Sequence, residues 1–445
     1  MSHSNGTLVD ELERWLRIPS VSSGSPDPAP LRAAAEWVCE RVAAAGGSAG
    51  LVEGYGHPLA VGTLRSRRRD APTVLIYGHY DVQDPGAPGD WASDPFVPEI
   101  RDGRIYARGA SDDKGNFLPL LAAACTLARA GDLPVHVRVL VEGEEEIGGP
   151  GAGRWIADDD GEIDCAVVYD SWMVDERTPA LTIGLRGIAQ AHITVRTGER
   201  DLHSGVYGGC VLNAAHVLHR MLAAVLPGPD GALRAELRAG LGRAGADEIA
   251  SWDALPPGDA VLAEAGGRPL DARAGADYYR RNWTGASLDV NALDVGAART
   301  IVPAVARATL TQRLAPDQRA EEIAAAMRAL LLAELPDGAT ADVRFELADP
   351  VRFGAELPAI RLAAEATRRA TGVTPRLVRW GGSIPIVAEL ARKGILVVVG
   401  GFALPADAPH APNESFRLES LRLGEATAHE LYAALAALPQ REVTA

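Results

Sequence analysis

The chain has 445 residues, enough for two or three domains that each bury a core. Its formal net charge of -15, from 44 basic and 59 acidic residues, argues against nucleic acid or an anionic membrane as the main partner. No membrane span is expected, because no apolar run approaches the ~20 residues that cross a bilayer. No signal peptide is expected either, because the N-terminus runs from polar residues straight into an amphipathic helix.

The four cysteines are scattered singly among apolar or small neighbours. This spacing predicts reduced, mostly buried thiols and a cytoplasmic protein, not a disulfide framework. Together with the acidic charge, it favours a protein that acts on small, soluble molecules.

The first predicted elements are two helices and a strand that is followed by a histidine. Residues 7–17 and 31–45 have helical spacing of apolar residues, and residues 72–77 form a short apolar strand. The strand runs into GHYDVQ, where His79 and Asp81 are two residues apart, so an extended chain points both side chains to the same side. A single histidine at such a place is more often a hydrogen-bonded turn residue than a ligand.

Acidic residues accumulate at the next strand and helix boundaries. Asp112 and Asp113 precede a long apolar helix, where carboxylates often only cap the helix. A buried strand that starts at Val135 is followed by four carboxylates: Glu142, Glu144, Glu145 and Glu146. Such a cluster repels itself unless it is solvated or surrounds a cation. The next strand, at 166–169, ends on Asp170.

These strand and helix units predict a parallel sheet with side chains gathered at one edge. Right-handed crossovers place the carboxyl ends of parallel strands side by side. We therefore expect five residues to converge: His79, Asp112, Glu145, Glu146 and Asp170. The rival is a dinucleotide-binding fold, suggested by GGPGAG from Gly148, but the glycine spacing does not match and the glutamates would repel a pyrophosphate.

The middle of the chain has a different pattern. Residues 188–197 alternate like a half-exposed antiparallel strand, and the loop DLHSGVYGG then carries His203. Further predicted elements are helices at 211–225 and 317–335 and strands at 306–314 and 341–347. We therefore predict an α+β domain at 188–349, inserted between the two parts of an α/β domain, 1–187 and 350–445.

The last part returns to the pattern of a buried core. A helix at 358–371 is followed by the turn WGGSIPIV and a strand at 394–399, and a final helix covers 418–438. His410 lies in a loop beyond the end of the strand, as His79 does. We therefore expect His410 near the same edge of the sheet.

Two histidines with several carboxylates and no cysteine suit a divalent ion, Zn²⁺ first, with Mn²⁺ or Co²⁺ as alternatives. If an aspartate bridges two ions, a shared water loses a proton near neutral pH and attacks a polarised carbonyl. One glutamate then remains off the metals as general base. The residues alone leave open whether this is Glu144, Glu145 or Glu146.

Several long motifs resemble the M20 family of metallopeptidases: GHYDVQ, ARGASDDKGN, EGEEEIGGPG, DLHSGVYGG and WGGSIP, with the late His410. Within the family they are most similar to the branch of cytosolic nonspecific dipeptidase and carnosinase. The resemblance implies a zinc-binding α/β domain with a mostly parallel sheet, interrupted by an α+β lid and dimerisation domain. It implies a metal-bridging hydroxide that cleaves the amide bond of a small peptide-like substrate.

The resemblance also implies a role for each matching residue. Asp112 becomes the ligand shared by two metal ions, with His79 and Asp170 on one and Glu146 and His410 on the other. Glu145 becomes the general base, and Asp81 orients His79. A cis peptide bond is implied between Asp112 and Asp113.

Other implied roles concern the substrate and a second subunit. His203 is implied to reach into the active site of the partner in a homodimer, where it stabilises the oxyanion. Arg313 is implied to grip the free carboxylate of the substrate, for which a guanidinium is suited. Gly382 and Ser383 match a loop that contacts the substrate backbone.

Two departures from the dipeptidase pattern bear on specificity. Trp380 stands where the pattern has an acid, and the segment DPVRFGAELP lacks a histidine that relatives carry. An N-acyl amino acid deacylase or a metabolite-specific tailoring amidase is therefore the alternative to a dipeptidase. A non-catalytic ligand-binding homologue is the remote alternative, and the complete set of ligands with Glu145 argues against it.

Overall fold

The computed structural model describes residues 4–24, 27–228, 231–382 and 384–439, and the chain forms two compact units. Unit 1 comprises Met1–Ile183, Phe353–Val378 and Pro385–Ala445, and unit 2 comprises Gly184–Arg352 and Arg379–Ile384. The segment 188–349, which the sequence predicts to be an insertion, falls inside unit 2. Its assignment as a lid and dimerisation domain stays a prediction.

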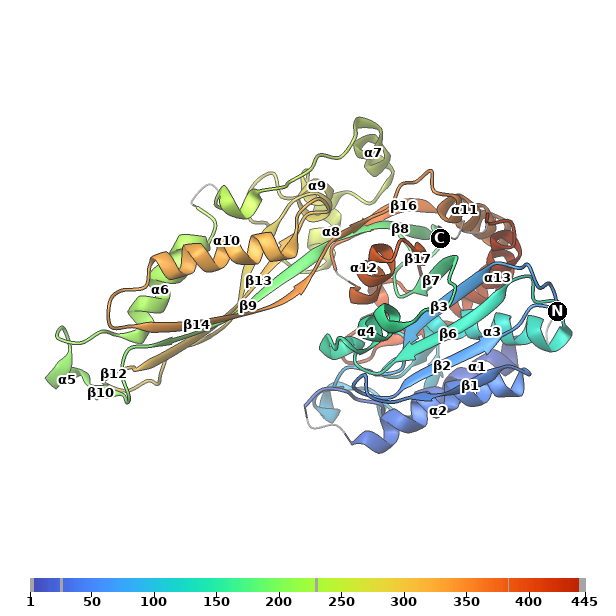
Figure 1. The fold of residues 1–445 in the computed structure, drawn as a ribbon, viewed down its shortest axis with the longest axis horizontal. Helices are drawn as coiled ribbons and strands as arrows, with labels where there is room; N and C mark the ends of the chain where they lie inside the picture. The colour runs from blue at the N-terminus through green and yellow to red at the C-terminus, as the bar shows by residue number, and fades with distance from the viewer. Residues whose placement is uncertain (1–3, 25–26, 229–230, 383, 440–445) are drawn as a thin grey trace. The chain divides into compact units, whose positions relative to one another are not determined.

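The main sheet has nine strands in the described part of the chain, in the order β1-β2-β6-β3-β7-β17-β8-β15, with β16 paired to β8 (Figure 1). The four central strands β6, β3, β7 and β17 are parallel, and antiparallel strands flank them on both sides. The α/β class with a mostly parallel centre is thereby confirmed. The bounds are β1 Ser48–Val52, β2 Leu59–Leu64, β3 Thr73–His79, β6 His136–Glu142, β7 Cys165–Tyr169, β8 Ala180–Leu185, β15 Val351–Arg352, β16 Arg376–Trp380 and β17 Leu396–Gly400.

Helices cover both faces of this sheet. One layer contains α1, α2, α3, α11 and α13, and the opposite layer contains α4 and α12 (Figure 1). The central strands are therefore buried on both sides, which is why they read as continuous apolar runs without alternation. The bounds are α1 Ser4–Leu16, α2 Pro28–Ala44, α3 Lys114–Ala130, α4 Gly151–Asp158, α11 Pro358–Thr371, α12 Pro385–Arg392 and α13 Leu418–Leu435.

Helix α3 is the central helix of the larger layer. It packs against strand β3 and against α1 and α13, so its residues are buried almost all round over the first three turns. Next to it, Trp15 stacks on Trp37 with ring centroids 4.8 Å apart and donates from Nε1 to the carbonyl of Ala34. Lys114, the first residue of α3, donates from Nζ to the carbonyls of Trp15 at 3.2 Å and Ile18 at 2.9 Å, which fixes this end of the helix. A small sheet of β4 (Glu99–Arg101), β5 (Arg104–Tyr106) and β18 (Ser415–Arg417) completes unit 1.

Unit 2 has an antiparallel sheet in the order β11-β13-β9-β14, with α6 and α10 packed on one face. Strand β9 alternates between buried and half-buried residues, so one face is covered and the other is not. The bounds are β9 Gly187–Arg196, β10 Leu202–His203, α5 Ser204–Tyr207, α6 Ala214–Val225, β11 Ser287–Asp294, β12 Ile301–Val302, β13 Val305–Leu314, α10 Ala320–Ala333 and β14 Thr340–Ala348.

The described residues between 226 and 283 include three short α-helices, none of which the sequence predicts. They are α7 Ala246–Ser251, α8 Gly258–Glu264 and α9 Tyr278–Trp283. An aromatic cluster holds part of the stretch together, because Trp283 packs on Trp252 and Tyr279 with ring centroids 5.5 and 4.6 Å away. Helices this short carry too few turns to show a hydrophobic period in the sequence.

Candidate metal centre

The carboxyl ends of three adjacent parallel strands meet at one edge of the main sheet. His79 is the last residue of β3 and lies opposite Glu142, the last residue of β6. Asp170 directly follows β7, which pairs with β3 on its other side. The convergence expected from the strand order is therefore present, and the side chains that follow these strands lie within reach of one another.

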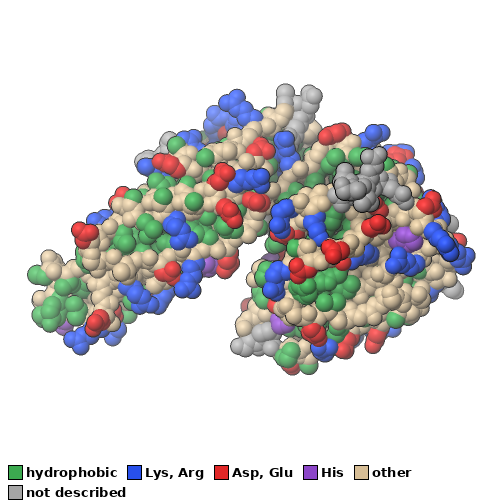
Figure 2. Space-filling view, viewed as in Figure 1, with side chains coloured by type: hydrophobic (Ala, Val, Ile, Leu, Met, Phe, Trp, Pro, Cys, Tyr) green, Lys and Arg blue, Asp and Glu red, His purple; other side chains and the backbone are tan. Residues whose placement is uncertain are grey.

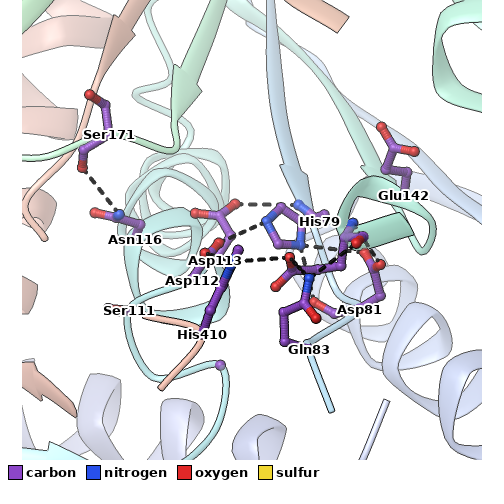
Figure 3. A network of polar contacts seen from close by, with 12 residues as sticks. His79, Asp81, Gln83, Ser111, Asp112, Asp113, Asn116, Glu142, Ser171 and His410 are labelled. Atoms are coloured by element: carbon purple, nitrogen blue, oxygen red, sulfur yellow. Dashed lines mark hydrogen bonds and ion pairs between the residues drawn. The ribbon is translucent and has the colours of Figure 1, made fainter. Parts of the chain in front are cut away.

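Two groups of side chains could each hold a metal ion. The first is His79, Asp112 and Asp170, and the second is Asp112, Glu146 and His410; in each group the ligand atoms lie within 4.8 Å of one another. Figure 3 shows Asp112 between the two imidazoles. Its Oδ1 is 3.1 Å from Nε2 of His79, and its Oδ2 is 2.9 Å from Nε2 of His410. Asp112 thus offers one oxygen to each group, which is the arrangement that a bridging ligand requires.

The electrostatics of the two groups fit divalent cations. Burial and the neighbouring carboxylates, Asp112 first among them, raise the pKa of Asp170 well above its usual range. Hydrogen bonds with Asp112 and Glu146 raise the pKa of His410 to about 10. The carboxylates of the two groups thus favour a positive charge among them, and a divalent cation would supply that charge. Oε1 of Glu146 is buried without a hydrogen-bond partner among the described residues, as expected of an atom that ligates a metal.

Residues 75–434 match the model of "Peptidase family M20/M25/M40". The chain belongs to this family. It is 31% identical over 376 residues to cysteinylglycine-S-conjugate dipeptidase of Corynebacterium striatum. The aligned region covers 80% of this chain and 80% of the relative. It is 36% identical over 149 residues to mouse Beta-Ala-His dipeptidase, and this aligned region covers 32% of this chain and 30% of the relative. The solved structure of the dipeptidase Dug1p from Saccharomyces cerevisiae superposes with a TM-score of 0.84 at 23% sequence identity. The superposition covers 99% of this chain and 100% of the Dug1p chain.

The family resemblance predicted from the motifs is thereby confirmed, and with it the prediction of a metallopeptidase. None of the described helices is long and apolar enough to cross a lipid bilayer. The four cysteines are free thiols, but only Cys125 and Cys165 are buried, whereas Cys39 is half-buried and Cys210 is exposed. The expectation of mostly buried thiols therefore holds for two of them.

The three consecutive glutamates of this M20 peptidase point in different directions. Glu144 faces the loop at 54–57, where its Oε1 accepts a hydrogen bond from the backbone N–H of His57 at 3.1 Å. Gly56 in that loop has φ of +93°, and a Cβ there would lie 2.1 Å from Oε2 of Glu144, so only glycine leaves space for this carboxylate. Glu146 faces His410, with Oε2 3.1 Å from Nε2.

Glu145 belongs to neither ligand group and is half-buried. Burial, followed by the charges of Asp112 and Glu146, raises its pKa to about 8, while His79 opposes this shift. The interactions with His79 and Asp112 show that its carboxyl group is close to the ligands. Of the three glutamates that the sequence left open, Glu145 is the one that remains beside the site without serving as a candidate ligand.

Further side chains hold the candidate ligands in place. Asp81 accepts a hydrogen bond from the backbone N–H of Glu146 at 3.1 Å, and its Oδ1 lies 3.4 Å from Nδ1 of His79. Gln83 donates from Nε2 to Oε2 of Glu146 at 3.0 Å (Figure 3). The residue type of Gln83 gave no signal for this role, although its position two residues beyond Asp81 in an extended segment places it on the same side.

Asp113 has a different role from the helix cap considered above. It occupies the N-cap position of α3, but its side chain makes no capping hydrogen bond. Its Oδ2 instead accepts from the backbone N–H of His79 at 3.3 Å. The peptide bond between Asp112 and Asp113 is cis, as the family resemblance implies.

The remaining candidate residues belong to unit 2. His203 is exposed between β10 and α5, and its Nδ1 accepts a hydrogen bond from the backbone N–H of Gly205 at 3.0 Å. Arg313 on β13 is half-buried, and burial lowers the pKa of its guanidinium. Gly382 is described, but Ser383 lies outside the described residues. The roles of these residues stay predictions.

Proposed function

We propose that the protein is a dinuclear metal-dependent hydrolase that cleaves the amide bond of dipeptides or similar small amino-acid conjugates. The observation that carries this proposal is the position of Asp112, whose two carboxylate oxygens face two separate groups of ligands. The similarity to cysteinylglycine-S-conjugate dipeptidase, which extends over 80% of the chain, supports a dipeptide as the substrate class. We propose that the protein acts in the cytoplasm, in line with its free thiols.

The proposed ligands are His79 and Asp170 for one ion and Glu146 and His410 for the other, with Asp112 shared. Zn²⁺ is the expected ion because imidazole and carboxylate donors suit it, and Mn²⁺ or Co²⁺ could replace it. Two such ions would polarise the scissile carbonyl and make water a nucleophile near neutral pH.

The protein's own contribution to the reaction is proton transfer and orientation. Glu145 takes a proton from the attacking water and delivers it to the leaving amine, for which a pKa near the working pH is suited. Asp81 orients His79 through its position beside Nδ1. Its hydrogen bond from the backbone N–H of Glu146 also fixes the segment that carries the base.

We propose that the active form is a homodimer in which His203 serves the partner's active site. Because Nδ1 of His203 accepts from Gly205, the neutral ring carries its proton on Nε2 and presents it as a donor suited to an oxyanion. Hydrophobic side chains gather at the end of unit 2 that carries α5 (Figure 2), where Val206 is 67%, Tyr207 44% and Val211 39% exposed. An apolar group of this kind is suited to cover by a second copy of the chain.

Mixing two inactive variants tests this dimer. His203→Ala and Glu145→Gln should each lower kcat by about 10²-fold or more. In a hybrid dimer, one site combines Glu145 of one subunit with His203 of the other, so random mixing should restore about a quarter of the wild-type activity. The measurement is dipeptide hydrolysis after the two variants are co-refolded. Hybrid dimers that form, as judged by native mass spectrometry, but stay inactive would contradict a role for His203 across the interface.

We propose that Arg313 binds the free carboxylate of the substrate and that Gly382 and Ser383 contact its backbone. A half-buried guanidinium presents several donors in the plane that a carboxylate matches, and partial desolvation strengthens the pair.

The second candidate function is an N-acyl amino acid deacylase or a tailoring amidase with the same mechanism. Trp380 favours it, because an apolar ring replaces an acid that could pair with the free amino group of a dipeptide. The backbone carbonyl of Trp380 accepts a hydrogen bond from the backbone N–H of Arg186. A Cβ on Gly382 would lie 2.6 Å from Nε1 of the Trp380 ring. Trp380 therefore lies directly beside the proposed substrate-contact loop. A non-catalytic homologue would have no use for a carboxyl group such as that of Glu145 next to the proposed ligands.

A substrate panel with and without metal tests the proposed function. We expect cleavage of dipeptides, Cys-Gly among them, that is lost after EDTA treatment and restored by Zn²⁺, Mn²⁺ or Co²⁺. Mass spectrometry of the products measures it, with acetylated and succinylated amino acids in the same panel. Preference for the acylated compounds would select the deacylase, and absence of metal-dependent cleavage on the whole panel would count against both functions.

A further inference from the structure

Glu414 is a buried carboxylate that lies outside both ligand groups. Its side chain is fully buried, and it directly precedes β18. Its two oxygens accept hydrogen bonds from five donors among the described residues. Oε2 accepts from Nη1 of Arg108 at 2.8 Å and from the backbone N–H of Gly109 at 2.9 Å. Oε1 accepts from the backbone N–H of Ser111 at 2.8 Å, from the hydroxyl Oγ of Ser111 at 3.2 Å and from the backbone N–H of Asp112 at 3.0 Å.

Four of these five donors belong to the segment 109–112, which ends on the shared ligand Asp112. The segment wraps around the carboxylate of Glu414, which is possible because Gly109 has φ of +83° and a Cβ there would lie 2.7 Å from Val82. A carboxylate that accepts several backbone N–H groups fixes the course of the backbone around it. The position of Asp112 is therefore set by Glu414 as well as by helix α3.

Glu414 also belongs to the loop that supplies the other ligand of the second group. It lies four residues after His410, and its backbone carbonyl accepts from the N–H of Ala107. Between the two, Asn413 accepts from the N–H of Ala92 at 2.8 Å and donates to the carbonyl of Asp90 at 3.1 Å. One residue thus connects segments about 300 positions apart, each of which carries a candidate ligand.

A purely structural ion pair with Arg108 is the simpler explanation, and the geometry counts against it. Arg108 supplies only one of the five donors, and a pair of this kind needs no contact with the segment that leads to Asp112. We propose that Glu414 is a positioning residue that holds Asp112 at the distance from His410 that metal binding requires. This inference rests on the proposed metal-dependent function.

The experiment measures Zn²⁺ affinity by competition with a chromophoric chelator in the full-length protein. In Glu414→Gln, an amide N–H₂ replaces one acceptor oxygen, so donors of the segment 109–112 lose their partner. We expect the affinity for Zn²⁺ to fall about 10- to 100-fold, as is typical when a residue that supports a ligand is changed. We also expect kcat to fall more than KM rises.

Asp159→Asn is the matched control. Asp159 makes a bidentate pair with Arg138 at 2.7 Å for both bonds, in unit 1, and neither residue contacts a candidate ligand. The control should lower the melting temperature of the metal-free protein and leave the affinity for Zn²⁺ unchanged. If Glu414→Gln also lowers only the melting temperature, Glu414 is a structural residue and the inference is wrong.

Two further measurements separate the possible failures. If Glu414→Gln does not give folded protein, Glu414→Asp keeps the charge but withdraws the carboxylate by one methylene group, and we expect at least a fivefold loss of Zn²⁺ affinity. An affinity equal to that of the wild type would overturn the inference. If the wild-type protein itself binds no divalent ion, the proposed function fails, whereas binding that is equal in the wild type and both variants removes only the role of Glu414.

Discussion

Replacement of Glu145 by glutamine is expected to lower kcat by about 10²- to 10⁴-fold, because glutamine cannot accept the proton of the attacking water. The change keeps the shape of a half-buried side chain beside the candidate ligands, so the fold should be unaffected. Because Glu145 belongs to neither ligand group, two metal ions should still bind. Steady-state kinetics on a cleaved dipeptide, with metal content determined by elemental analysis, provides the measurement.

Glu144→Gln is the control for this variant, since it makes the same chemical change one residue earlier. Glu144 faces the backbone N–H of His57, and glutamine keeps an oxygen that can accept this hydrogen bond. Its kcat should stay within a few-fold of the wild type. A Glu145→Gln enzyme that retains full activity would show that another group acts as base.

Asp112→Asn is expected to have the second large effect, on both metal ions at once. Asparagine offers a neutral amide in place of a carboxylate with two oxygens, so it can no longer serve the groups of His79 and His410 together. We expect kcat to fall by about 10³-fold or more and the affinity for both ions to decrease. Elemental analysis after dialysis against a fixed free Zn²⁺ concentration measures the number of ions bound.

Asp170→Asn separates a shared ligand from a ligand of one ion. Asp170 belongs only to the group of His79. The variant should therefore retain close to one ion under conditions in which Asp112→Asn retains none. Equal losses in the two variants would contradict the assignment of Asp112 as the bridge, and circular dichroism would show that both proteins are folded.

The sequence was sufficient to predict the parallel centre of the sheet and the edge at which the candidate ligands gather. Strands β3 and β7 are buried on both faces, so their apolar runs are visible without structural knowledge. Once the strands are known to be parallel, topology alone places His79, Asp112 and Asp170 at one edge. His410 was found for the same reason, because it lies in a loop beyond a buried strand.

Residue type and spacing could not show which of the three consecutive glutamates is the candidate base. Their directions depend on partners far away in the chain, namely the loop that contains Gly56 for Glu144 and His410 for Glu146. The part played by Glu414 depends likewise on contacts with residues about 300 positions earlier. The sequence also did not predict that β17 pairs between β7 and β8, because strand order within a sheet depends on packing between residues far apart in the chain.

The position of β17 has a consequence for how the molecule is made. During synthesis β7 and β8 leave the ribosome long before β17, yet β17 lies between them in the finished sheet. The edges of β7 and β8 that face β17 therefore have no partner in this sheet until residues 396–400 have been synthesised. Only then can the loop with His410 reach Asp112, so the second group of candidate ligands forms after most of the chain has been synthesised.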